Sequence, residues 1–164
     1  LVAIVAAIMI ILCCPPPHDQ EAPIRVPIIM YHDVKQAPVC EDDYLISTDT
    51  LECDVKAILD AGFHPISVSE LIDYVYDGKA LPDKPVVLTF DDGYKTMRTQ
   101  VLPLLEKYKV PAAMALIGAR AEAIQDGCNH ADYLSWEDVR KLAKSERIDL
   151  ARVSLSKGSI HAAG

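Results

Sequence analysis

The stretch Pro85-Val86-Val87-Leu88-Thr89-Phe90-Asp91-Asp92-Gly93-Tyr94 decides the fold of this chain. An apolar, β-branched run bounded by proline and glycine is typical of a strand that is buried on both faces. The strand ends in two adjacent aspartates, and near a core two like charges are costly unless a cation lies beside them. A divalent metal is the simplest such cation, and it would leave one carboxylate free to act as a base.

Apolar runs and helical patterns alternate along the rest of the chain. Runs at residues 26–31, 64–68, 110–117 and 148–151 are expected to be further strands. After the sharp turn that Gly93 allows, residues 96–108 are expected to form an amphipathic helix, in which Pro103 predicts a kink or a late start. Strands that alternate with helices indicate an α/β fold with a parallel sheet.

Three more helices have recognisable beginnings. Ser47 or Thr48 can cap a helix whose apolar face consists of Leu51, Val55, Ile58 and Leu59. Ser67-Val68-Ser69-Glu70 has the form of a capping box, and the helix that follows, residues 71–76, is expected to bury Leu71, Ile72 and Val75. Ser135 can cap a helix that starts at Trp136.

The segment Leu88-Thr89-Phe90-Asp91-Asp92-Gly93-Tyr94 resembles the first motif of the polysaccharide deacetylases, also called the NodB-homology family or carbohydrate esterase family 4. Three other segments are similar to family segments in the same order along the chain: residues 26–32 (VPIIMYH), 101–118 (VLPLLEKYKVPAAMALIG) and 136–151 (WEDVRKLAKSERIDLA). The resemblance covers residues 24–151, and its specificity comes from this co-linear set rather than from a single motif.

The resemblance implies a distorted (β/α) barrel, of which this chain would supply only the first four or five strands. An unfinished parallel barrel exposes the edge of its last strand and leaves its interior open. We therefore expect the domain to be marginally stable, or to be closed by another element. A cooperative thermal transition of a monomeric domain would count against this expectation.

The resemblance also implies a reaction, which is the metal-dependent hydrolysis of N-acetyl groups from a GlcNAc-containing polysaccharide such as peptidoglycan. Asp91 would be the general base, and Asp92 would be a ligand of the metal, expected to be Zn²⁺. Gly93 and Tyr94 would belong to the substrate pocket. His32, at the end of the first strand, would join them, although a loop histidine bonded to the backbone is also compatible with the sequence.

The chain departs from the family pattern after Ala151. In the family a His-x3-His pair follows this strand and completes the metal site, whereas here residues 152–164 form a divergent tail without such a pair. A catalytic zinc usually needs three protein ligands, so Asp92 without the two histidines would give a weak metal site. The missing pair indicates a member of the family that is C-terminally truncated or altered. The alternative function is that of a catalytically inactive remnant, which at most binds glycan. A Mg²⁺-dependent phosphoryl-transfer enzyme is disfavoured, because such enzymes usually separate their two aspartates by one residue.

Length and composition limit the remaining possibilities. The length of 164 residues indicates one domain. The net charge of −8 disfavours nucleic acid as a partner. Residues 1–14 are apolar and are expected to be an export signal or a membrane anchor, with a Pro-rich linker at 15–25 and the domain at 26–151. We therefore expect an extracytoplasmic protein, secreted or held at the cell membrane, that acts on an N-acetylated glycan.

Several other polar residues are assigned no chemistry. Glu41-Asp42-Asp43 is interpreted as a solvated turn, because its spacing does not match a calcium loop. His64 is expected to be structural or exposed. A disulfide between Cys40 and Cys53 is conceivable, but the sequence does not fix it. His130 and His161 are not expected to bind the metal.

Overall fold

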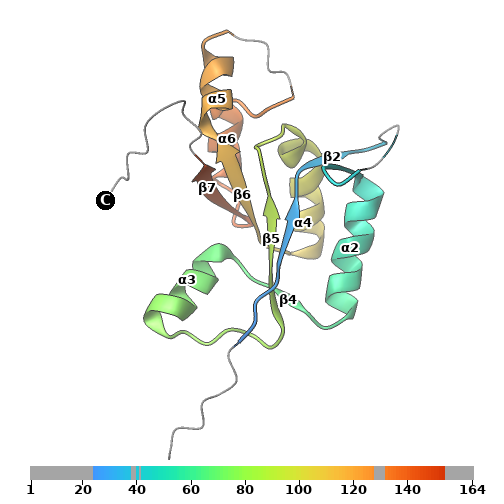
Figure 1. Ribbon diagram of the computed structural model, residues 1–164, viewed down its shortest axis with the longest axis vertical. Helices are drawn as coiled ribbons and strands as arrows, with labels where there is room; N and C mark the ends of the chain where they lie inside the picture. Colours follow the sequence, from blue (N-terminus) through green and yellow to red (C-terminus); the bar gives the residue numbers. More distant parts are fainter. Residues whose placement is uncertain (1–23, 38–39, 41, 128–131, 154–164) are drawn as a thin grey trace, which may run out of the picture.

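The computed structural model describes residues 24–37, 40, 42–127 and 132–153 (Figure 1). The expected signal or anchor at 1–14 and the tail from 154 onward lie outside these residues, and so do His130 and His161. Within the described ranges, no helix is long and apolar enough to cross a bilayer. The domain boundaries at 14, 25 and 151 stay predictions.

A parallel sheet with the order β1-β5-β6-β7 forms the centre of the molecule. Its strands are β1 (Ile28–Tyr31), β5 (Pro85–Phe90), β6 (Ala112–Ile117) and β7 (Ile148–Val153). In β5 every residue is buried except the half-buried Thr89, as the apolar run predicted. The residues that immediately follow β5 therefore emerge from the middle of the sheet rather than from its edge.

The remaining strands are short. β4 (His64–Pro65) pairs with the first two residues of β5, and it ends earlier than expected because Ser67 caps the next helix. β2 (Asp33–Lys35) and β3 (Leu45–Ser47) form a separate parallel pair. The sequence analysis missed this pair, because three residues are too few to show an alternating pattern.

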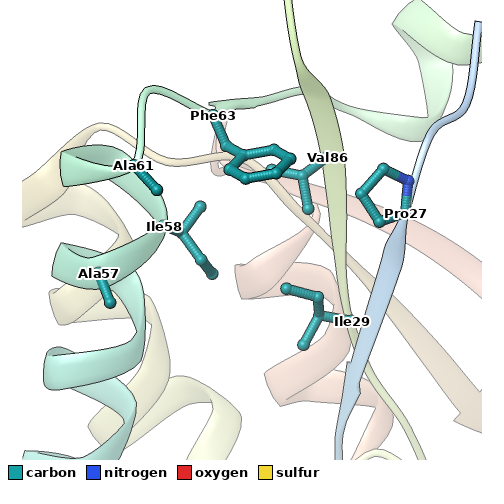
Figure 2. Close-up of a pocket in the computed structure, with 7 residues that line it drawn as sticks. All are labelled: Pro27, Ile29, Ala57, Ile58, Ala61, Phe63 and Val86. Atoms are coloured by element: carbon teal, nitrogen blue, oxygen red, sulfur yellow. The ribbon is translucent and has the colours of Figure 1, made fainter.

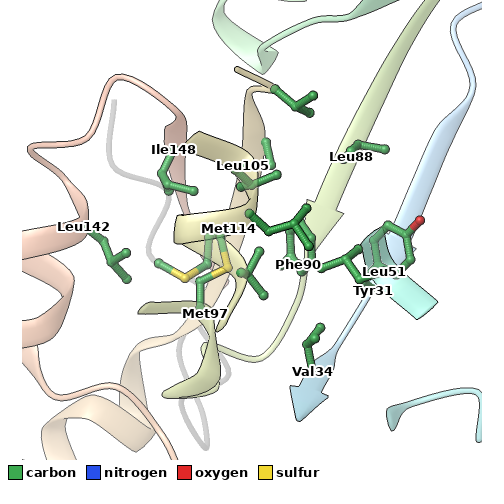
Figure 3. Packing of buried hydrophobic residues seen from close by; sticks show 14 of the residues in the cluster. Tyr31, Val34, Leu51, Leu88, Phe90, Met97, Leu105, Met114, Leu142 and Ile148 are labelled. Atoms are coloured by element: carbon green, nitrogen blue, oxygen red, sulfur yellow. The ribbon is translucent and has the colours of Figure 1, made fainter. Parts of the chain in front are cut away.

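The core lies between the sheet and the helices α2 (Thr48–Asp60), α4 (Leu102–Tyr108) and α6 (Trp136–Leu142). Figure 3 shows side chains from the strands and helices meeting there. The largest fully buried members include Leu51 of α2, Leu88 and Phe90 of β5, Leu105 of α4, Met114 of β6 and Leu142 of α6. The apolar periodicity of α2 is confirmed, since Leu51 and Val55 are buried and Ile58 and Leu59 are partly buried against the cluster.

The helix after Gly93 covers the expected residues, 96–108, but it consists of two parts. A π-helical turn, η1 (Met97–Val101), leads into α4, whose second residue is Pro103. Proline has no N–H to donate and is tolerated in the first turn of a helix. The turn before Pro103 is π-helical. The amide of Leu102 donates to Met97 O, five residues earlier, where an α-helix would have a bond to the residue four earlier.

Helix α3 (Val68–Asp77) corrects one expectation. Its predicted capping box between Ser67 and Glu70 is present, but the helix has no buried residue. Ile72 is 50% exposed and Val75 is 62% exposed, because α3 lies apart from α2 and α4, at the end of the molecule where β5 begins (Figure 1). Amphipathic spacing predicts which face is apolar, and the described part of the chain does not cover that face.

The sheet is also unequally covered. On β1, Ile29 and Tyr31 contact the core, whereas Ile28 and Met30 point to the other face and are 61% and 59% exposed. Parallel sheets in closed folds are covered on both faces. The described residues therefore have the architecture expected from the sequence, an α/β fold that forms part of a (β/α) barrel.

Candidate active site

The two aspartates lie where β5 ends, as the sequence predicted. The amide of Asp91 donates to Tyr31 O at 2.8 Å, so the pairing with β1 extends to the first aspartate. Asp92 and Gly93 both have left-handed backbone angles, with φ of 72° and 75°, and the chain leaves the sheet there. Aspartate tolerates this conformation better than most residues, and such strain is common at functional sites.

Gly93 is required by close packing as well as by its backbone angle. A Cβ atom at this position would lie 2.6 Å from Leu116 Cδ2 of β6. The turn therefore packs directly on the neighbouring strand, which holds the aspartate pair against the carboxyl ends of β5 and β6.

The environment of Asp91 favours a carboxylate that takes up a proton more readily than usual. Burial raises the pKa of Asp91 above its ordinary value. The charge of His32 lowers this pKa and the charge of Asp92 raises it, and the net direction is upward. A base must be deprotonated but not too weak, so this shift suits a group that accepts a proton from water.

His32 lies at the carboxyl end of β1, next to the aspartates, where the sequence analysis expected a pocket residue. Its ring makes an edge-on contact with Tyr44, with ring centres 4.9 Å apart. Its Nδ1 atom is buried and has no hydrogen-bond partner among the described residues. Nδ1 therefore makes no hydrogen bond to the described backbone, and the assignment of His32 to the substrate pocket stays a prediction.

A second group of side chains surrounds Asp92. Arg120 Nη1, from α5 (Gly118–Gln125), lies 3.3 Å from Asp92 Oδ2. The Arg120 guanidinium lies over the ring of Tyr133 at 4.1 Å from its centre, and this ring stacks on Tyr94 with centres 4.8 Å apart. The hydrogen bond between the two tyrosines, with burial adding to it, raises the pKa of Tyr94 to about 12. Tyr94 therefore stays protonated near neutral pH.

Sequence reasoning missed Arg120 and Tyr133. One signal was available for Arg120, since it lies in the first turn of the helix after β6, and the active sites of parallel α/β folds lie at the carboxyl ends of the strands. Tyr133 had no local signal. It is brought to the site by pairing with a turn about forty residues away, through the bonds from Lys95 N to Asp132 O and from Leu134 N to Gly93 O, at 2.8 and 2.9 Å.

The other polar candidates lie away from this site or play structural roles. His64 is exposed, and its Nδ1 lies 2.7 Å from Asp83 O. Asp42 accepts hydrogen bonds from the amides of Tyr44 and Leu45, as expected of a turn. Cys40 and Cys53 are both free thiols, so the conceivable disulfide between them is not formed.

The described residues do not fit a three-ligand zinc centre. They contain no group of three or more histidine, cysteine, aspartate or glutamate side chains that could hold a metal ion. The Asp92 carboxylate, expected to be a ligand, is instead paired with the Arg120 guanidinium. We therefore assign no chemical step to a metal held by these residues alone.

An apolar pocket lies apart from the aspartates. It has a volume of about 320 Å³ and lies between α2 and the first halves of β1 and β5 (Figure 2). It is lined by Pro27, Ile29, Ala57, Ile58, Ala61, Phe63 and Val86. None of these side chains can transfer a proton or bind a metal, so the pocket is not a candidate for catalysis.

Comparison with known proteins gives one consistent result. The polysaccharide deacetylase family matches residues 78–156. The chain is 30% identical over 131 residues to the poly-β-1,6-N-acetyl-D-glucosamine N-deacetylase of Escherichia coli K12, which covers 75% of this chain and 20% of that protein. The chain thus spans about a fifth of the length of this curated relative.

Solved structures agree with the sequence match. A de-N-acetylase from Aggregatibacter actinomycetemcomitans superposes with a TM-score of 0.71 at 26% identity. The BpsB deacetylase domain from Bordetella bronchiseptica superposes with a TM-score of 0.62 at 27% identity. Each match covers 77% of this chain and 53% of the other. On its motif, its fold and these similarities, the chain belongs to the polysaccharide deacetylase family.

Proposed function

We propose that the protein containing this chain hydrolyses N-acetyl groups of a GlcNAc-containing polysaccharide. The observation that carries the proposal is the aspartate pair at the end of β5, in a member of a family of deacetylases. In the reaction, a water oxygen attacks the acetyl carbonyl carbon, the C–N bond breaks, and acetate and a free amine are released. The attacking water must lose a proton, and Asp91 is the group that accepts it, since its raised pKa suits this transfer.

Other residues of the site receive roles that follow from their positions. His32 and Tyr94 flank the aspartates and would contact the sugar, and Gly93 allows the turn that carries the aspartates to pack against Leu116 of β6. In the whole protein Asp92 would be one ligand of a divalent metal, expected to be Zn²⁺, and such a metal would supply Lewis-acid chemistry. The described residues do not complete its ligand set, so metal dependence stays a proposal about the whole protein.

The substrate is proposed from the relatives. The similar protein of E. coli is named for poly-β-1,6-N-acetyl-D-glucosamine, which makes this polymer the first substrate to test and peptidoglycan the second. Both polymers lie outside the cytoplasm, which fits the expected extracytoplasmic location. The role of residues 1–14 as a signal or anchor stays a prediction.

Acetate release tests the proposal. The whole protein that contains this chain would be incubated with oligomers of β-1,6-linked GlcNAc and, separately, with peptidoglycan, with and without added Zn²⁺. We expect release from at least one substrate, and a loss of about 100-fold or more in kcat for Asp91→Asn, the usual contribution of a general base. Asp60→Asn, an exposed change at the end of α2, is the control and should have no effect.

The alternative function is glycan binding without catalysis. It takes its support from the Asp92–Arg120 pair, which places a side-chain cation where the family would need a metal. Oligomer binding without any acetate release, in the presence of Zn²⁺, would favour this alternative. If neither substrate bound or reacted, both functions would be wrong for this chain.

A further inference from the structure

The Asp92 carboxylate already has a cationic partner that belongs to the chain itself. Arg120 Nη1 lies 3.3 Å from Asp92 Oδ2, and the Nη1 atom is buried although both side chains remain about one-third exposed. The contact is an ion pair rather than an aligned hydrogen bond, because Nη1 has no hydrogen-bond partner among the described residues. The charge of Asp92 is thus compensated without any ion from solution.

The guanidinium is held from its other side by an aromatic ring. Its central carbon lies 4.1 Å from the centre of the Tyr133 ring, well within the range of a cation–π interaction. Tyr133 in turn stacks on Tyr94 at 4.8 Å, with the ring planes 28° apart. Arg120 therefore contacts both a carboxylate and a ring face, and the ring is supported by a second aromatic side chain.

Both contact surfaces are fixed to the same turn. Asp92 lies in this turn, and Tyr133 is attached to it by an isolated β-bridge to Tyr94 and by the hydrogen bond from Leu134 N to Gly93 O at 2.9 Å. The position between carboxylate and ring is therefore built by the backbone rather than by chance contacts of exposed side chains. An isolated exposed ion pair contributes little to stability. When the cation also lies over an aromatic ring whose position is fixed by the backbone, the cation is held more firmly.

We infer that Arg120 is the resident counter-cation of Asp92, so that a divalent cation binds the Asp91–Asp92 pair only by displacing the Arg120 guanidinium. This inference differs from the family expectation, in which Asp92 would bind a metal directly. It concerns cation binding and does not depend on the proposed hydrolysis. The guanidinium and a divalent cation compete for the same oxygen atoms, and only one of them can neutralise Asp92 at a time.

A metal titration measures this competition. Mn²⁺ alone would be added to the whole chain after treatment with EDTA and its removal, and the free ion would be counted by electron paramagnetic resonance. We expect Arg120→Gln to bind Mn²⁺ at least about tenfold more tightly than the unaltered chain, a factor that corresponds to 1.4 kcal/mol. Arg140→Gln removes an exposed arginine from the last turn of α6 and should leave the affinity unchanged.

Two further variants locate the effect. In the double variant Asp92→Asn/Arg120→Gln the gain in Mn²⁺ affinity should disappear, because the freed carboxylate is no longer present. Tyr133→Leu should give part of the gain, because it removes the aromatic support but leaves the guanidinium. If Arg120→Gln bound Mn²⁺ no more tightly than the unaltered chain, including the case in which neither binds it, the inference would be overturned.

A second measurement covers the possibility that Arg120→Gln does not fold. Rotation about the Cζ–Nε bond of Arg120 can be followed by ¹⁵N NMR in the unaltered chain, with EDTA present. We expect restricted rotation that becomes fast in Asp92→Asn, and no such change for Arg140. Equal rotation rates with and without the Asp92 carboxylate would show that the two side chains are not a stable pair, and this too would overturn the inference.

Discussion

At the scale of single residues, the turn after β5 combines two left-handed positions with a close contact. Asp92 supplies a side chain that tolerates this backbone, and Gly93 supplies the absence of one. The contact with Leu116 makes Gly93 more demanding than a glycine that merely ends a helix. Gly78, which ends α3 at a φ of 68° and has no atom within 4 Å of a built Cβ, offers the matched comparison.

Substitution of these two glycines should separate backbone strain from steric overlap. Gly78→Ala should cost about 1–2 kcal/mol of unfolding free energy, from the left-handed backbone alone. Gly93→Ala should cost about 1–3 kcal/mol more, because its Cβ would overlap Leu116. Urea denaturation of both variants measures the difference. Equal costs would show that the Leu116 side chain moves aside, so that close packing does not require glycine at position 93.

The pKa of Asp91 gives a second prediction for a single residue. His32 lowers this pKa, so His32→Gln should raise the Asp91 titration midpoint further above the ordinary aspartate value. Carboxyl ¹³C NMR of Asp91 over a pH series measures the midpoint. His64→Gln is the control, because His64 contacts Asp83 O away from the site. A downward shift in His32→Gln would contradict the electrostatics described for the pair.

The sequence predicted some of these residues and could not predict others. Asp91 and Asp92 were identifiable because a buried strand that ends in two charges is unusual in itself. Arg120 had a weaker signal, because it lies in the first turn of α5, shortly after β6 ends. Tyr133 was not detectable, because the backbone pairing that brings it to Asp92 forms between distant segments and leaves no local pattern.

At the scale of elements, capping was more predictable than burial. Ser47, Ser67 and Ser135 all cap helices as expected, because a cap depends only on residues within one turn. The burial of α3 was predicted wrongly, because burial depends on what lies against the helix. The π-helical turn before Pro103 was predictable only in part, because a proline indicates an irregular helix but does not indicate a π-helical turn.

The contact between α2 and α4 provides a pH-dependent prediction. Glu52 of α2 accepts hydrogen bonds from Lys107 and Tyr108 of α4, and Lys56 lies 3.2 Å from the same carboxylate oxygen. The bond from Lys107 is the largest cause that lowers the Glu52 pKa to about 2. A carboxyl group whose pKa is lower in the folded state stabilises that state at pH values above its unfolded-state pKa. This stabilisation is lost as the pH falls towards the folded-state pKa.

Glu52→Gln should therefore destabilise the protein near pH 7, and the difference should shrink as the pH falls from about 4.5 to about 2. Chemical denaturation at several pH values measures it. Glu106→Gln, a change in α4 outside this cluster, is the control. A difference that stayed constant down to the lowest pH would show that Glu52 is not ionically linked to α4.

At the scale of the whole molecule, the described chain is a parallel sheet whose edge strand β1 is covered by the core on one face only. Ile28 and Met30 on β1, and Ile72 and Val75 on α3, are among the large apolar side chains that are exposed in the described residues. The alternation of strands and helices predicted the fold class correctly. How completely the sheet is covered could not be predicted, because it depends on the whole set of packed elements rather than on any one of them.

Amide NMR of the ¹⁵N-labelled chain shows whether an N-acetylated glycan binds beside the aspartate pair, as we propose. A β-1,6-linked GlcNAc oligomer would be titrated into the whole chain, with an unacetylated glucosamine oligomer as the control. The account predicts chemical-shift changes at His32, Asp91, Asp92 and Tyr94, at the carboxyl ends of β1 and β5. Changes confined to the apolar pocket around Ile58 and Phe63, or no change anywhere, would contradict it.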